Sequence, residues 1–350
     1  MKITFAQIGN YGIALKSLIE ELGHQYIEPD RTNQETIEQG VKIAPETICL
    51  PCKVNLGNYL SAIKKGAEAV LMFNSQGQCR FRYYGLLQEK ILKDYGHNVS
   101  FIIFSGKDIV RKLKSLGQVS LGELMRVLKI TWQKIKLIDE MENLARFYRP
   151  REIKKGAADN LLKECLDDLK RTKRIESFKN HRETVRQKFN KIEIDSQRDV
   201  LKVGIIGEIF TVIDGFVNQN IEANLGELGV EARRDLNLTA FVRHNLWPFS
   251  KRKIKKQAKD YLTFSVGGHG LESVAEMLNY AKNDFDGVIH LFPFSCMPEV
   301  TVRPILEKIR QDKNIPLLSL SLDEQSGQAG IRTRLEAFVD LIRAKKSKKS

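Results

Sequence analysis

The sequence has few cysteines and lacks the long apolar runs of membrane proteins. Only five of its 350 residues are cysteine, an odd number without the spacing of secreted disulfide-rich domains, so we expect no disulfide framework. No stretch approaches the roughly eighteen consecutive apolar residues of a transmembrane helix. The N-terminus MKITFAQIGNYG has neither a signal-peptide apolar region nor a small-residue cleavage site. We therefore expect a cytoplasmic globular protein.

Acidic residues are outnumbered by basic ones. The chain has 57 Lys and Arg against 43 Asp and Glu, a formal net charge of +14. This excess favours an anionic partner, which could be nucleic acid, a phosphorylated ligand such as a nucleotide or coenzyme A, or an acidic protein surface. Between residues 149 and 191 there are fourteen basic and seven acidic residues. A solvated helix face explains such a run equally well, so charge alone does not identify the partner.

The order of apolar patterns predicts an α/β fold with a helical insert. In residues 1–107, β-rich runs such as EAVLMFNS alternate with helical patterns, and residues 199–345 repeat this alternation. Such alternation is typical of parallel sheets covered by helices. Residues 108–198 carry no strand pattern and form a basic helical region between the two domains, while residues 346–350 are expected to be a frayed basic tail.

Four of the five cysteines fall at loops next to predicted helices. Cys49 and Cys52 stand at the start of a helix, whereas Cys79 and Cys296 each follow a predicted strand. Ligands of open α/β sheets bind where such loops meet helix N-termini. If the two domains face each other, these thiolates could hold a metal or an iron–sulfur cluster. A redox CxxC pair and inert thiols remain open alternatives, and Cys165 is expected to be a small buried hydrophobe.

Sequence blocks around these cysteines resemble a known family. The blocks include CLPCKVNLGNYLSAIKKGAEAVLMF, KVGIIGEIFTV, VGGHGLESVAEM, FDGVIHLFPFSCMPE and DEQSGQAGIRTRLEAF. Together they resemble the "CoA protein activase" proteins of the 2-hydroxyacyl-CoA dehydratase superfamily. The resemblance implies two Rossmann-like or flavodoxin-like α/β domains. It also implies an iron–sulfur cluster, expected to be [4Fe-4S], with Cys49, Cys79 and Cys296 as ligands and Cys52 as a further candidate.

The resemblance also implies a reaction and a partner. In the dehydratases, a separate ATP-hydrolysing activator injects a low-potential electron, and a CoA thioester then loses an unactivated hydroxyl group through a ketyl radical. This chain has no G-x-x-x-x-G-K-[ST] loop, so it resembles the component that receives the electron. We expect an anaerobic lyase or reductase component acting on an acyl-CoA or another small molecule, as a homo- or heterodimer.

Two other functions remain open. The first is a non-catalytic electron-transfer or cluster-carrying accessory protein. The second is a nucleic-acid-binding protein that uses the basic insert, although the chain lacks a motif of interleaved basic and aromatic residues. Cys52 separates the catalytic and electron-transfer functions, because a fourth thiolate would close a cluster that three thiolates leave open to substrate. Family members often lack a cysteine at this position, so we predict that Cys52 is a spare or weak ligand.

Six further residues are candidates for handling substrate: His269 and Glu299 for catalysis, and Gly267, Gly268, Arg332 and Arg334 for binding phosphate groups. The glycines precede a helix, whose free backbone N–H groups could hold a phosphate, and the histidine could donate a proton. The glutamate could support a cluster ligand or only favour a helix N-terminus. Salt bridges explain the arginines as well as coenzyme A phosphates do.

Overall fold

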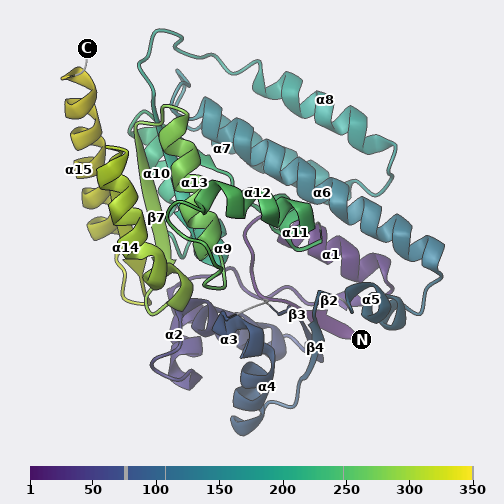
Figure 1. The fold of residues 1–350 in the computed structure, drawn as a ribbon. Helices are drawn as coiled ribbons and strands as arrows, with labels where there is room; N and C mark the ends of the chain where they lie inside the picture. Colours follow the sequence, from purple (N-terminus) through teal and green to yellow (C-terminus); the bar gives the residue numbers. More distant parts are fainter. Residues whose placement is uncertain (75–77, 107, 247, 349–350) are drawn as a thin grey trace.

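Two parallel four-stranded sheets form the framework of the protein (Figure 1). The structure is a computed structural model that describes residues 1–74, 78–106, 108–246 and 248–348. Its two all-parallel sheets, surrounded by helices, confirm the α/β fold class and the presence of two parallel-sheet domains. The exact bounds of these domains remain predictions.

The N-terminal sheet is built from short apolar strands, which are β1 (Lys2–Thr4), β2 (Gln25–Tyr26), β3 (Ala69–Phe73) and β4 (Ser100–Phe104). Their order is β2-β1-β3-β4. The connecting helices are α1 (Gly12–Glu21), α2 (Gln34–Ile43), α3 (Leu50–Lys64), the short 3-10 helix η1 (Arg80–Tyr83), α4 (Tyr84–Asp94) and α5 (Ile109–Gly117). The apolar run of β3 is buried because helices cover both faces of a parallel sheet.

Three helices without strands follow: α6 (Leu121–Tyr148), α7 (Ala157–Arg171) and α8 (Ser177–Phe189). They lie along one side of the molecule (Figure 1). A capping box between Ser120 and Glu123 begins α6. Apolar residues of all three helices share one core with Tyr11 and Ala14 at the start of α1. The basic insert is therefore packed onto the N-terminal domain through a continuous apolar face.

The C-terminal sheet repeats the first one, with strands β5 (Leu201–Gly207), β6 (Val230–Arg234), β7 (Gly287–Pro293) and β8 (Leu317–Leu322). Their order, β6-β5-β7-β8, corresponds to that of the N-terminal sheet. Its helices are α9 (Ile209–Ile213), α10 (Ile221–Glu227), α11 (Leu238–Leu246), α12 (Pro248–Ala258), α13 (Gly270–Lys282), α14 (Met297–Asp312) and α15 (Gln328–Ser347). The predicted tail thus begins in the last turn of α15, and residues 349–350 lie outside the described residues.

Helix α3 joins the two sheet domains. Every residue from Leu50 to Ala62 is buried. On one side α3 packs on α2 in backbone contact, since a Cβ at Gly40 would lie 1.9 Å from the carbonyl oxygen of Lys53. On the other side its first turn belongs to the core of the C-terminal sheet, and Lys53 forms an ion pair of 2.5 Å with Glu324. These contacts fix the N-terminus of α3, and Cys49 with it, at the domain interface.

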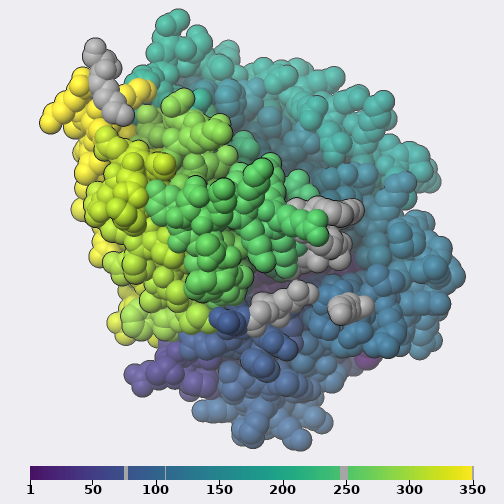
Figure 2. Space-filling view, viewed as in Figure 1, coloured from purple at the N-terminus to yellow at the C-terminus, as the bar shows by residue number. Residues whose placement is uncertain are grey.

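The two sheet domains and the helical region also adjoin one another at the surface of the molecule (Figure 2). In the space-filling view, N-terminal residues lie directly below the C-terminal domain, and the helical region borders both (Figure 2). Within the described parts of the chain, we find no helix with the length and apolar character needed to cross a membrane.

Candidate functional site

Three cysteines occupy equivalent positions, each directly before a helix. Cys49 precedes α3, Cys79 precedes η1 and α4, and Cys296 precedes α14, all with extended backbone. Cys79 lies beyond the end of β3 and Cys296 beyond the end of β7, so the two sheets present thiols at equivalent edges. The positive ends of helix dipoles favour negative charge at such positions.

Charge interactions link Cys49 to the thiols of both Cys79 and Cys296. A negative charge on Cys79 raises the pKa of Cys49, and a charge on Cys49 raises the pKa of Cys296. Both domains therefore contribute to a single thiol cluster, which we call the three-cysteine site (Cys49, Cys79 and Cys296). None of the five cysteines forms a disulfide.

Arg80 links the three loops that carry these cysteines. Its Nη2 donates to the carbonyl oxygen of Ser295 at 2.6 Å, next to Cys296. Its Nη1 donates to the carbonyl oxygen of Thr47 at 3.2 Å, two residues before Cys49. The Ser295 hydroxyl also donates to the Thr47 carbonyl, at 3.3 Å. One guanidinium next to Cys79 thus holds the other two loops in place by charge-assisted hydrogen bonds.

Burial keeps the Cys49 and Cys296 thiols protonated in the metal-free protein. Desolvation raises the pKa of Cys49 to about 11, although a hydrogen bond with the Tyr84 hydroxyl, 2.8 Å from the sulfur, lowers it. Desolvation also raises the pKa of Cys296, and the nearby carboxylates of Glu299 and Glu208 raise it further. A metal that binds these sulfurs must therefore displace protons.

Cys52 is more deeply buried than Cys49, although both pack in the same apolar cluster. It is fully buried in an apolar cluster that includes Leu56 and Met72. The Gln88 side-chain amide donates to its sulfur at 3.5 Å. Desolvation, followed by the charge of Cys49, raises the pKa of Cys52 to about 12. Cys165 is also buried, in the apolar core of the helical region. This agrees with the expectation that Cys165 serves as a small buried hydrophobe.

Glu208 is a residue of this site that sequence reasoning missed. It follows β5 and caps α9 by accepting hydrogen bonds from the backbone N–H groups of Phe210 and Thr211, at 3.0 and 2.9 Å. Its charge raises the pKa of both Cys49 and Cys296. Its signal in the sequence was the strand-ending IIGE, which falls at the same edge of the sheet as the cysteine loops.

Glu299 lies beneath the site in a buried polar cluster. Its Oε2 accepts a hydrogen bond from the Ser273 hydroxyl at 2.9 Å and lies 2.9 Å from Nε2 of His290. Both Glu299 and His290 are fully buried. Its backbone N–H also interacts with the Cys296 sulfur and lowers the pKa of that thiol. Glu299 therefore joins the first turn of α14 to α13 and β7. Its carboxylate is buried and holds the Cys296 loop in place through these contacts.

The Gly267–Gly268 turn packs directly on the Cys79 loop. A Cβ at Gly267 would lie 2.9 Å from the Cys79 backbone nitrogen, and both glycines have positive φ angles, +85° and +50°. Glycine is needed here for this approach and for these φ angles. Desolvation lowers the pKa of the adjacent His269 to about 4. The imidazole is therefore neutral at physiological pH.

The two predicted phosphate-binding arginines lie on α15. Arg332 forms ion pairs with Glu336 at 3.1 Å and with Glu227 at 3.6 Å, and both arginines are exposed. Neither has a contact with the three-cysteine site among the interactions of the described residues. The structure thus separates these arginines from the residues that it brings together around the cysteines.

Gln78, at the start of the Cys79 loop, is exposed.

The donor set fits an iron–sulfur cluster better than a single ion. No three His, Cys, Asp or Glu side chains of the described residues converge closely enough to hold one metal ion. Ligands to a cluster bind different iron atoms and need not converge on one point. Three thiols, contributed by both domains and set at three helix N-termini, are the soft donors that such a cluster takes.

Comparison with known proteins identifies the family. No curated protein sequence matches the chain significantly. Residues 26–342 match the family described as "2-hydroxyglutaryl-CoA dehydratase, D-component", a match that covers the whole helical region and both sheets apart from β1 and the first residue of β2. This extent confirms the resemblance to the 2-hydroxyacyl-CoA dehydratase superfamily. The chain belongs to the 2-hydroxyglutaryl-CoA dehydratase D-component family.

Proposed function

We propose that this protein is the iron–sulfur subunit of a dehydratase-like system, with a cluster held by Cys49, Cys79 and Cys296. The observation that carries the proposal is the placement of three cysteines, from both sheet domains, at helix N-cap positions whose loops Arg80 joins. A bound cluster of this kind supplies low-potential one-electron chemistry.

The surrounding residues would prepare the site for the cluster. Arg80 holds the three loops together before any metal binds and supplies positive charge near the thiolates. The Tyr84 hydroxyl forms a hydrogen bond with the Cys49 sulfur, and it favours the thiolate because it can donate to it. Glu299 and the Gly267–Gly268 turn hold the loops of Cys296 and Cys79 from behind. His269 stays neutral and can donate or accept one hydrogen bond.

The partner in this proposal is a separate ATP-hydrolysing activator that delivers the electron, and the substrate class is an acyl-CoA. Membership of the dehydratase component family supports both, and the sequence has no P-loop motif of its own. ATP alone should therefore leave the absorption spectrum of the protein unchanged, whereas ATP together with the activator should bleach it. Hydrolysis of ATP by this chain, abolished by a substitution within it, would contradict this division of labour.

The cluster itself is tested by anaerobic purification. We expect brown protein that contains iron and acid-labile sulfide in comparable amounts, because the thiols are soft donors in a partly enclosed site. Reconstitution with iron and sulfide under anaerobic conditions is the second arm. Protein that binds only zinc, or no metal at all after reconstitution, would overturn the proposal.

The environment of Cys52 argues for an open cluster rather than a closed electron-transfer centre. A fourth thiolate would have to come from a fully buried residue whose sulfur accepts a hydrogen bond from Gln88. The nucleic-acid alternative has no comparable support. Basic side chains of the helical region form ion pairs within it, such as Arg186 with Glu140 at 2.5 Å and Lys188 with Glu164 at 2.6 Å.

A further inference from the structure

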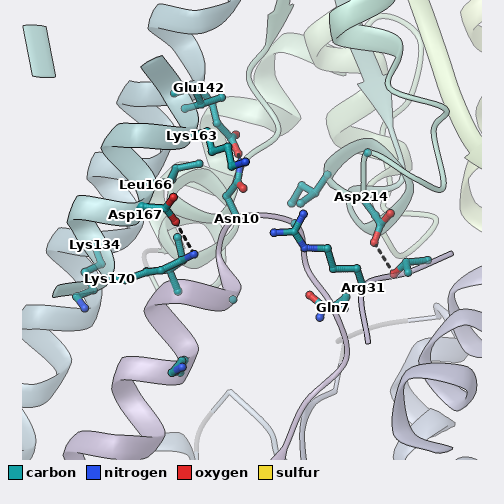
Figure 3. Close-up of a pocket in the computed structure, with 18 of the residues that line it drawn as sticks. Gln7, Asn10, Arg31, Lys134, Glu142, Lys163, Leu166, Asp167, Lys170 and Asp214 are labelled. Atoms are coloured by element: carbon teal, nitrogen blue, oxygen red, sulfur yellow. Dashed lines mark hydrogen bonds and ion pairs between the residues drawn. The ribbon is translucent and has the colours of Figure 1, made fainter. Parts of the chain in front are cut away.

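A cavity of about 1130 Å³ lies beside the loops that follow β1 and β5 (Figure 3). Gln7 and Asn10 of the first loop, Asp214 of the second, and side chains of α6 and α7 form its walls. The cavity therefore lies beyond the carboxyl ends of β1 and β5, the edge of an open α/β sheet where ligands bind. None of the described cysteines lines this cavity, so it is distinct from the three-cysteine site.

Many charged groups in the cavity wall already have partners. Arg149 pairs with Asp159 at 2.6 Å, and Lys170 pairs with Asp167 at 2.7 Å, the second of which is drawn in Figure 3. Arg234 is held between two glutamates. These pairs occupy four of the eight acidic side chains in the wall: Asp159, Asp167, Glu142 and Glu222.

Four basic side chains in the wall make no hydrogen bond or ion pair within the part of the chain that the structure describes: Arg31, Lys134, Lys163 and Lys173. Lys134 is the most unusual, because only 2% of it is exposed. Desolvation lowers its pKa, and the charge of Lys173 lowers it further, although Glu20 and Glu21 oppose this. A buried ammonium without a close partner is costly, and a bound anion would offset that cost.

We propose that this cavity binds an oligophosphate group, with Lys134 as its buried anchor and Lys163, Lys173 and Arg31 as outer contacts. Several separated cations suit an anion with more than one charged group, and lysines bind phosphate oxygens as point charges. The cavity is larger than an oligophosphate alone needs, so the group would be carried by a larger organic molecule. This inference stands on the cavity and does not depend on the cluster.

Calorimetric titration of the full-length, cluster-loaded protein with inorganic pyrophosphate tests the proposal. We expect saturable binding that weakens as salt rises. Lys134→Met keeps the apolar stem but removes the charge, and should weaken binding about tenfold or more, the usual effect of losing a charge-assisted hydrogen bond. Lys179→Gln, exposed on α8 and outside the cavity, makes the same change in net charge and should bind normally.

Further arms identify the carrier and separate this site from the cluster. ADP or coenzyme A should bind more tightly than pyrophosphate, and the tighter of the two names the organic group. Lys163→Gln changes an exposed side chain and leaves the fold intact, so it should weaken binding without unfolding the protein. Cys49→Ser should bind pyrophosphate normally while losing iron. Absence of saturable binding, equal weakening by Lys179→Gln, or loss of binding in Cys49→Ser would overturn the proposal.

Discussion

At the scale of single residues, the Tyr84 hydroxyl controls how readily Cys49 ionises. Because this hydroxyl stabilises the thiolate, Tyr84→Phe should raise the pKa of Cys49 further above its ordinary value. Alkylation of Cys49 in the metal-free protein, followed by peptide mass spectrometry between pH 7 and pH 9, should slow about tenfold, the usual effect of one lost hydrogen bond to a charged group.

The matched control is Tyr83→Phe. The Tyr83 side chain is 61% exposed, and no hydrogen bond joins it to a cysteine among the described residues, so its removal should leave the alkylation rate unchanged. Equal rates for Tyr84→Phe and the original protein would show that the hydroxyl does not act on the sulfur.

Residue types and spacing predict the cysteine positions better than the residues around them. Cys79 and Cys296 follow strands and precede helices, a pattern that is visible in the sequence and that the structure reproduces. Tyr84 is buried beside the site. Its hydrogen bond to Cys49 joins positions 35 residues apart, and no local pattern reports such a contact. The approach of Gly267 to the Cys79 backbone could not be predicted for the same reason, because the two positions are far apart in the sequence.

At the scale of elements, the close crossing of α2 and α3 positions the Cys49 loop. A Cβ at Gly40 would collide with the Lys53 carbonyl, so Gly40→Ala should separate the helices. We expect the free energy of unfolding to fall by about 3 kcal/mol, at the upper end of overpacking costs, with loss of iron from the Cys49 site. Urea unfolding and iron analysis measure the two effects.

Gly330→Ala provides the control for this substitution. Gly330 lies in α15, and nothing would lie within 4 Å of its Cβ. Alanine should therefore stabilise the protein by about 0.5 kcal/mol or more, since it favours the helix. If Gly40→Ala left the free energy of unfolding unchanged, α2 and α3 could move apart without loss of stability. Their crossing would then not fix the Cys49 loop.

The three cysteine loops form a second group of elements, joined through Arg80. Arg80→Gln should leave the fold intact but speed the loss of iron to a chelator about tenfold, because the loops lose two charge-assisted hydrogen bonds. Arg82→Gln is the control, since Arg82 lies over the exposed Tyr83 ring. If Arg80→Gln lost iron to the chelator at the same rate as the original protein, Arg80 would not hold the cysteine loops together.

At the scale of the whole molecule, a buried ion-pair network joins the helical region to the C-terminal domain. Burial alone would raise the pKa of Glu222, but Arg146, Arg234 and Arg149 lower it to about 2. A lowered pKa contributes stability that is complete above the unfolded value near pH 4.5 and is lost as the pH falls towards 2. Glu222→Gln should cost about 3 kcal/mol, because it removes one of the two carboxylates that neutralise the buried Arg146 and Arg234.

Acid unfolding tests this network directly. The stability of Glu222→Gln should depend less on pH between 4.5 and 2 than that of the original protein, because the titrating group is gone. Glu227→Gln, on the same helix and 55% exposed, should have little effect on either quantity. Identical pH profiles for the original protein and Glu222→Gln would contradict the assignment.

The overall architecture was predictable from alternation of strands and helices, whereas the way in which the parts meet was not. Periodicity gives each sheet, but the burial of α3 on both sides depends on contacts such as Lys53 with Glu324, 271 residues apart. The basic helix α12 also escaped a structural prediction, since its run of Lys and Arg leaves few apolar residues from which to read a helical period. Similarly, the cavity beside β1 and β5 exists only once three parts of the chain are assembled.

The central claim is that Cys49, Cys79 and Cys296 together hold an iron–sulfur cluster, and iron content in a series of serine variants tests it most directly. After anaerobic reconstitution, each of these three variants should lose most of its iron and sulfide. Cys52→Ser and Cys165→Ser, which alter buried thiols in apolar surroundings, should retain both. Full retention of iron in any of the first three variants, or its loss in Cys52→Ser to the same degree as in Cys49→Ser, would contradict the account.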